Sequence, residues 1–190
     1  EHPAHNRTVL GSSPSGPTNF IMDVEKIKKE VLSYIVDFLE VPHEEFGGFP
    51  PCPFAKAERL KNKLLIDVYD PDKQLFTDVV KKMIDSGYES GVFALFKDGN
   101  PVSIEEKETR SFQKFLNKTL KEASLDDYKS ICINPKDSLE VKGILVRGLS
   151  PYFLINIGLK KAFGKTHKSL KGSKYFTNFP ENYKKYLKVD

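Results

Sequence analysis

The chain has 190 residues, of which 39% are hydrophobic and 29% are charged, and its formal net charge is +4. That length suits one ordinary domain, and that apolar fraction is enough for a hydrophobic core, which excludes a chain that is disordered throughout. No stretch approaches the roughly 18 consecutive apolar residues of a membrane span, no signal-peptide pattern is present, and two cysteines do not make a disulfide framework. We therefore expect a cytoplasmic protein without a membrane partner.

Changes in composition divide the chain into three parts. Residues 1–21 are rich in Gly, Ser and Pro and are expected to be a leader or linker, with Met22 as the natural start. Residues 22–165 carry the periodic apolar patterns of a single α+β domain. Residues 166–190 are a basic, aromatic C-terminal segment, and from Leu159 to Asp190 the chain holds nine lysines against two acidic side chains.

The first half of the domain alternates helices with strands. An amphipathic helix is predicted over residues 22–40, with Asp23 as its N-cap. A loop rich in Pro and Gly follows, and Pro53 is expected to open a short helix that ends near residue 61. The patterns then predict a strand at 63–69, a helix at 73–86 and a buried strand at 91–97.

The second half contains a long helix, further strands and a final helix. Ser103 and Glu106 form a capping-box pattern for a helix that runs to about residue 122. A third strand is predicted at 130–134, and 139–147 is a fourth strand or a bent continuation with Gly143 at a bulge. The final helix is predicted at 151–163, with Ser150 as its N-cap and Pro151 in its first turn.

The predicted order contains two steps in which a helix connects successive strands. Such connections make the two strands parallel, either side by side or with a neighbour inserted between them. We therefore expect an α+β protein, a two-layer sandwich in which one roughly four-stranded sheet has βαβ steps and follows the N-terminal amphipathic helix. Ferredoxin-like and thioredoxin-like arrangements both remain open.

Cys52 is the first candidate for chemistry. If Pro53 opens a helix, the Cys52 sulfur faces unpaired backbone N–H groups and the positive end of the helix dipole. Lys56 and Arg59 follow on nearly the same side, so the pattern favours a thiolate with a lowered pKa, as in nucleophilic cysteines. The competing interpretation is a buried structural cysteine, because its neighbours in the sequence are apolar.

His43 is a candidate acid–base partner for Cys52, because it precedes the same loop. One histidine and one cysteine do not make a zinc-binding pattern, so no metal site is expected. Ser150 and Arg147 form a second candidate, since a capped helix start beside an arginine suits a carboxylate or phosphate. The competing interpretation is an ordinary capped helix with a surface arginine.

Two short motifs together resemble an uncharacterised bacterial family that is catalogued as a domain of unknown function. Its members have Leu-Cys-Pro-Phe-Ala after an N-terminal helix, and residues 52–55 here read Cys-Pro-Phe-Ala. Later they have His-Pro and then Asn-Arg-Ser/Ala-Pro-Tyr-Pro, where this chain has Asn-Pro at 134–135 and Ser-Pro-Tyr at 150–152. The resemblance spans roughly residues 24–165 and implies that Cys52, Arg147 and Ser150 share a cleft. It implies no activity.

The sequence thus favours a cleft for a small anionic ligand or for thiol catalysis around Cys52 and Arg147, with Lys56, Arg59 and Ser150 as further ligand contacts and no cofactor indicated. A nucleic-acid-binding module is the alternative, because lysines contact phosphates and aromatic rings stack on bases. Its candidate residues are Lys171, Lys174, Tyr175, Lys184 and Lys185. A non-catalytic interaction protein is a third hypothesis. If the aromatic rings of the C-terminal segment pack onto the domain, they cannot stack on bases, which would argue against nucleic-acid binding.

Overall fold

The computed structural model describes residues 22–146, 148–181 and 183–184. The predicted leader 1–21, Arg147 and Lys185 therefore lie outside the described residues. The first element is helix α1 (Val24–Tyr34), which a π-helical turn (Ile35–Leu39) continues. The side chain of Asp23 accepts a hydrogen bond from the backbone N–H of Lys26, which confirms the predicted N-cap.

The main sheet has the strand order β1-β2-β7-β4, and the short strand β3 (Asn100–Pro101) pairs with β2. Strands β1 (Leu64–Tyr69) and β2 (Ser90–Lys97) are parallel and are connected by helix α3 (Phe76–Asp85). Helix α4 (Glu106–Glu122) connects β2 to β4 (Tyr128–Ile133). Strand β7 (Leu154–Leu159) lies between β2 and β4 and is antiparallel to both. The expected α+β class, with its βαβ step and its inserted strand, is confirmed.

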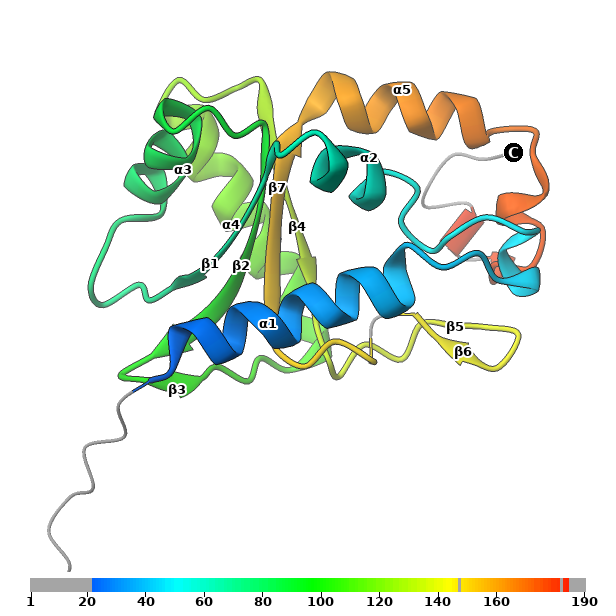
Figure 1. Ribbon diagram of the computed structural model, residues 1–190, viewed down its shortest axis with the longest axis horizontal. Helices are drawn as coiled ribbons and strands as arrows, with labels where there is room; N and C mark the ends of the chain where they lie inside the picture. The colour runs from blue at the N-terminus through cyan, green and yellow to red at the C-terminus, as the bar shows by residue number, and fades with distance from the viewer. Residues whose placement is uncertain (1–21, 147, 182, 185–190) are drawn as a thin grey trace, which may run out of the picture.

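Helices cover both faces of this sheet (Figure 1). On one face, α3 and α4 bury Val80, Met83 and Leu116 against Phe93 and Ile157 of the sheet. The sheet and the layer formed by α3 and α4 make the expected two-layer sandwich. On the opposite face, α1 and its π-helical turn pack against the ends of β1, β2 and β7, with core residues that include Val31, Ile35, Ala94 and Leu154.

The predicted helix at 151–163 is wrong. Residues 154–159 form the central strand β7, and helix α5 (Lys160–Leu170) begins directly after it. A strand that is buried on both faces has a continuous apolar run, which resembles a helical pattern over a few residues. Ser150 is therefore not a helix cap, and its hydroxyl donates a hydrogen bond to the backbone carbonyl of Tyr152 at 2.6 Å.

Three local predictions also need correction. Residues 140–145 form a separate hairpin, β5 (Glu140–Val141) with β6 (Ile144–Leu145), and add no strand to the main sheet. Helix α2 (Ala55–Leu60) begins two residues after Pro53, with Phe54 at its N-cap. Helix α4 has Glu105 at its N-cap without a side-chain cap bond, so the predicted capping box is not formed.

The described part of the C-terminal segment packs onto the domain. Its aromatic residues Tyr175, Phe176 and Phe179 are buried. They form a third core cluster together with Phe46, Val141 and Leu170. Gly47, with φ +66°, ends the short 3-10 helix Glu44–Phe46 beside a second one, Lys174–Phe176. A Cβ atom at Gly47 would lie 2.5 Å from the Cβ of Lys174, so the two segments touch closely.

Candidate functional site: an apolar cavity beside the sheet

A cavity of about 310 Å³ lies on the α1 side of the sheet. Its floor is formed by residues on that face of the sheet, and residues of α5 form one side. Figure 1 shows α5 and α1 on the same side of the sheet. The C-terminal end of α1, the loop around Cys52 and the C-terminal aromatic cluster complete its walls. The lining is mostly aliphatic and aromatic, with a floor made by Leu64, Val92, Ile131, Ile133, Leu154 and Asn156.

Asn156 is a polar side chain in the middle of this apolar floor. The sheet register places it between Val92 on β2 and Ile131 on β4. Strand alternation puts Leu154 and Gly158 on the same face. The Asn156 side chain has no hydrogen-bond partner among the described residues. An amide in a mostly apolar environment without such a partner is unfavourable for folding, so this position calls for another explanation.

His167 is a second polar group at the cavity and comes from α5. Phe163 and Leu170, four residues before it and three after, line the same cavity, as expected for one face of a helix. The Nε2 atom of His167 is buried and has no hydrogen-bond partner within the described parts of the chain. Its ring packs edge-on against Phe176, with the ring centroids 5.7 Å apart.

Cys52 lines the cavity, but it does not have the expected thiolate environment. Burial is the main effect and raises the pKa of the Cys52 thiol above its ordinary value. Hydrogen bonds from the backbone N–H groups of Ala55 and Phe54 oppose this shift, whereas the negative charge of Glu40 adds to it. The predicted lowering of the pKa is therefore wrong, because the thiol is desolvated more strongly than the turn stabilises its charge.

The predicted anion-binding side chains do not converge on the cavity. Arg59 binds the buried carboxylate of Glu40 through two hydrogen bonds, from Nε at 2.7 Å and from Nη2 at 2.6 Å. Lys56 is exposed on α2, and Ser150 is buried away from the lining. No Lys or Arg lines the cavity among the residues that the structure describes, and Arg147 lies outside them.

His43 is placed away from the cavity lining. Its ring lies between Phe38 and Phe46, with centroid distances of 5.4 Å and 6.1 Å. Its backbone forms an isolated bridge with Phe49, and its Nε2 atom is buried without a described hydrogen-bond partner. The structure therefore does not bring His43 and Cys52 together in one pocket.

The residues of the nucleic-acid alternative are divided. Tyr175 is buried, and its hydroxyl donates a hydrogen bond to the backbone carbonyl of Pro51 at 2.6 Å, so its ring is not available to stack on a base. Lys171 and Lys174 are exposed, whereas Lys184 pairs with Glu181 at 2.7 Å. Lys185 lies outside the described residues.

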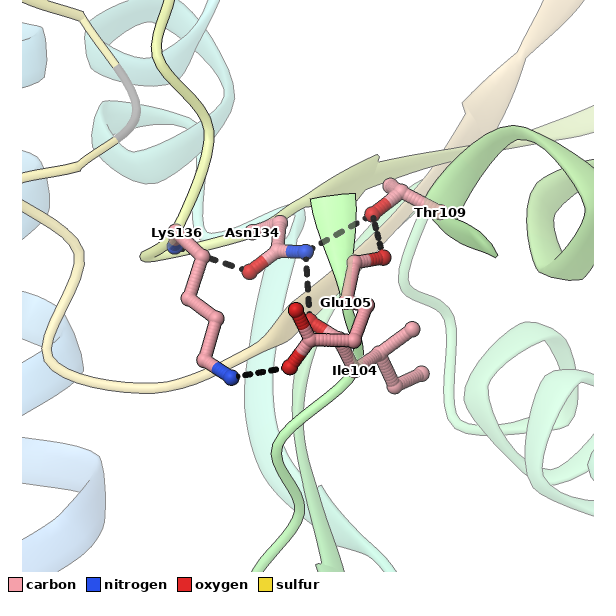
Figure 2. Close-up of polar contacts among 5 residues, drawn as sticks. All are labelled: Ile104, Glu105, Thr109, Asn134 and Lys136. Carbon is pink, nitrogen blue, oxygen red and sulfur yellow. Dashed lines mark hydrogen bonds and ion pairs between the residues drawn. The ribbon is translucent and has the colours of Figure 1, made fainter. Parts of the chain in front are cut away.

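Asn134, which stands where the resembled family has histidine, belongs to a structural network (Figure 2). Its side-chain amide donates to the backbone carbonyl of Ile104 at 2.9 Å and to the hydroxyl of Thr109 at 2.7 Å. Its side-chain oxygen accepts from the backbone N–H of Lys136 at 2.9 Å. This network ties the end of β4 to the start of α4, and its hydrogen bonds are satisfied within the protein.

Sequence reasoning missed Asn156 and His167. Asn156 would have attracted attention only if 154–159 had been read as a strand, because then a single polar side chain falls between apolar cross-strand neighbours. His167 has no sequence signal of its own, since it sits among lysines of an amphipathic helix.

The described residues hold neither a candidate metal cluster nor a candidate membrane-spanning helix. Within these residues, no three His, Cys, Asp or Glu side chains are grouped so that they could hold a metal ion. No helix among them is both long enough and apolar enough to cross a membrane. Comparison with protein-family models, curated proteins and solved structures found no match. The resemblance to the uncharacterised bacterial family therefore stays a prediction.

Proposed function

We propose that the protein binds a small, uncharged and mainly apolar molecule in the cavity between the sheet and α5. The observation that carries this proposal is the size and lining of the cavity, about 310 Å³ with a mostly apolar wall. Small-molecule pockets have volumes of about 300–1,000 Å³ and combine an apolar lining with a few polar groups. An apolar cavity of about 150 Å³ already binds benzene, so this one suits a molecule of about two fused rings.

The same lining argues against the two functions that the sequence favoured. An anionic ligand entering this cavity would meet no Lys or Arg side chain among the described lining residues, and a buried charge without a partner is strongly unfavourable. A nucleophilic thiol needs a thiolate, but burial raises the pKa of Cys52. In this proposal Cys52 is one contact of the ligand, and no covalent step is involved.

The proposal is tested by titrating the protein with naphthalene and following methyl groups by NMR. The sheet provides an internal control, because Ile131 and Ile133 line the cavity whereas Ile155 and Ile157 face α3 and α4. We expect saturable shifts at Ile131 and Ile133 and almost none at Ile155 and Ile157. The absence of saturable shifts, or equal shifts on both faces of the sheet, would refute binding in this cavity.

A cavity-filling variant adds a second test. Val92 lies on the floor beside Asn156, and Val92→Phe places a larger side chain in the space that the ligand occupies. We expect this variant to remain folded and to lose naphthalene binding, while Val80→Ile, in the core on the opposite face, keeps it. Unchanged affinity in a folded Val92→Phe protein would place the ligand elsewhere.

A further inference from the structure

Asn156 and His167 line the apolar cavity, and neither the Asn156 side chain nor the His167 Nε2 atom has a hydrogen-bond partner among the described residues. These two groups indicate which kind of ligand the cavity would bind. We propose that the ligand carries an uncharged hydroxyl or carbonyl group on an apolar body, and that Asn156 and His167 are its hydrogen-bonding partners. This inference rests on the proposed function, since it specifies the chemistry of a molecule bound in that cavity. It assigns a recognition role to both residues.

Asn156 is half-buried, and its hydrogen bonding differs from that of two other asparagines of the domain. The side chain of Asn134 makes three hydrogen bonds within the protein. The side chain of Asn117 likewise donates to the carbonyls of Gln113 and Ser130 and accepts from the N–H of Ser130. Asn156 makes none of these bonds in the described protein, although it sits on the central strand. Its amide is therefore available to donate to a ligand and to accept from one.

His167 offers a second polar group, from the α5 wall of the cavity. Its buried Nε2 atom either donates or accepts in the neutral imidazole, according to the tautomer. The contact with Phe176 restricts the ring orientation. A buried polar atom without a partner carries a desolvation cost, and a ligand hydroxyl or carbonyl in the cavity offsets that cost.

The charges around the cavity favour an uncharged polar group. Glu58 is the one charged side chain among the described lining residues, and it lies 3.7 Å from Lys61. A ligand carboxylate or phosphate would therefore meet no Lys or Arg side chain among the described lining residues. A hydroxyl group both donates and accepts, so it can satisfy an amide and an imidazole without bringing a charge into an apolar space.

Three matched probes separate this inference from the proposed function. Naphthalene, 2-naphthol and 2-naphthoate share one ring system and differ in having no polar group, an uncharged hydroxyl and a carboxylate. Methyl NMR at pH 7 gives the dissociation constant of each. A hydrogen bond contributes a net ~1 kcal/mol, so we expect 2-naphthol to bind about fivefold more tightly than naphthalene. We expect 2-naphthoate to bind more weakly than 2-naphthol.

Two variants test the assigned residues. Asn156→Leu and His167→Phe are each expected to reduce the roughly fivefold preference for 2-naphthol, by weakening 2-naphthol up to about fivefold while naphthalene stays unchanged or binds slightly more tightly. The methyl resonances of Ile155 and Ile157 report whether each variant is folded, and the wild-type comparison of probes stands if one is not. The inference is overturned if naphthalene binds but 2-naphthol gains nothing, if 2-naphthoate binds most tightly, or if neither folded variant changes the preference. Failure of every probe to bind would instead refute the proposed function.

Discussion

The two asparagines Asn134 and Asn156 predict opposite effects of the same substitution. Asn134 is 1% exposed and makes three hydrogen bonds to protein groups, and Asn134→Leu removes all three of them (Figure 2). Asn156 has no partner among the described residues and faces an apolar cavity, so Asn156→Leu removes no protein hydrogen bond and adds apolar contact. We expect the first variant to be strongly destabilised and the second to be as stable as the wild type or more stable.

The magnitude follows from the number of bonds that are lost. Each intramolecular hydrogen bond contributes a net ~1 kcal/mol to stability, so the three bonds of Asn134 amount to about 3 kcal/mol. For a chain of this size, that loss lowers the melting temperature by about 6–12 °C. For Asn156→Leu we expect a change between zero and about 1 kcal/mol in the stabilising direction, because an apolar side chain replaces a half-buried amide that has no partner among the described residues.

Urea denaturation of the ligand-free proteins, followed by circular dichroism, measures the free energy of unfolding of each variant and of the wild type. Equal slopes of the unfolding free energy against urea concentration would show that the variants unfold from comparable native states. The reasoning is refuted if Asn156→Leu is destabilised as much as Asn134→Leu, because Asn156 would then have a structural partner. Combined with the probe titrations, a stable Asn156→Leu protein that loses its preference for 2-naphthol would indicate that stability has been exchanged for recognition.

Three further predictions follow from burial and close contact. Alkylation of Cys52 by iodoacetamide should have a pH midpoint above the ~8.5 of a free thiol, because burial favours the neutral form; a lower midpoint would contradict this. Tyr152 is half-buried and hydrogen-bonded to Glu30, which raises its pKa to about 12. The stability that this tyrosine contributes is therefore present below about pH 10 and is lost as the pH rises through about 12; ultraviolet titration should show a tyrosine that ionises near pH 12 and that Tyr152→Phe removes. Gly47→Ala should lower the melting temperature, because φ is positive and the new Cβ would collide with Lys174; thermal unfolding at wild-type values would contradict the close contact.

Local patterns in the sequence predicted many of the secondary-structure elements. The amphipathic periodicity identified α1 and α3, and the capping role of Asp23 followed from its position before the first apolar residue. Helix α4 was predicted from a capping-box pattern that the structure does not form. Apolar runs bounded by turns identified β1, β2 and β4. These elements are predictable because their signals are short-range: residues three or four apart share a helix face, and alternate residues share a strand face.

The tertiary structure alone decided the identity of 151–163 and the composition of the cavity. Residues 154–159 are a strand because β2 and β4 pair with them on both sides, and neither neighbour is close to them in the sequence. Cys52, Asn156 and His167 line one space only because the sheet, the loop and α5 fold together, and the shift in the pKa of Cys52 arises from the same burial. The sequence by itself therefore determined the α+β class and most elements, whereas long-range pairing and burial determined the candidate site.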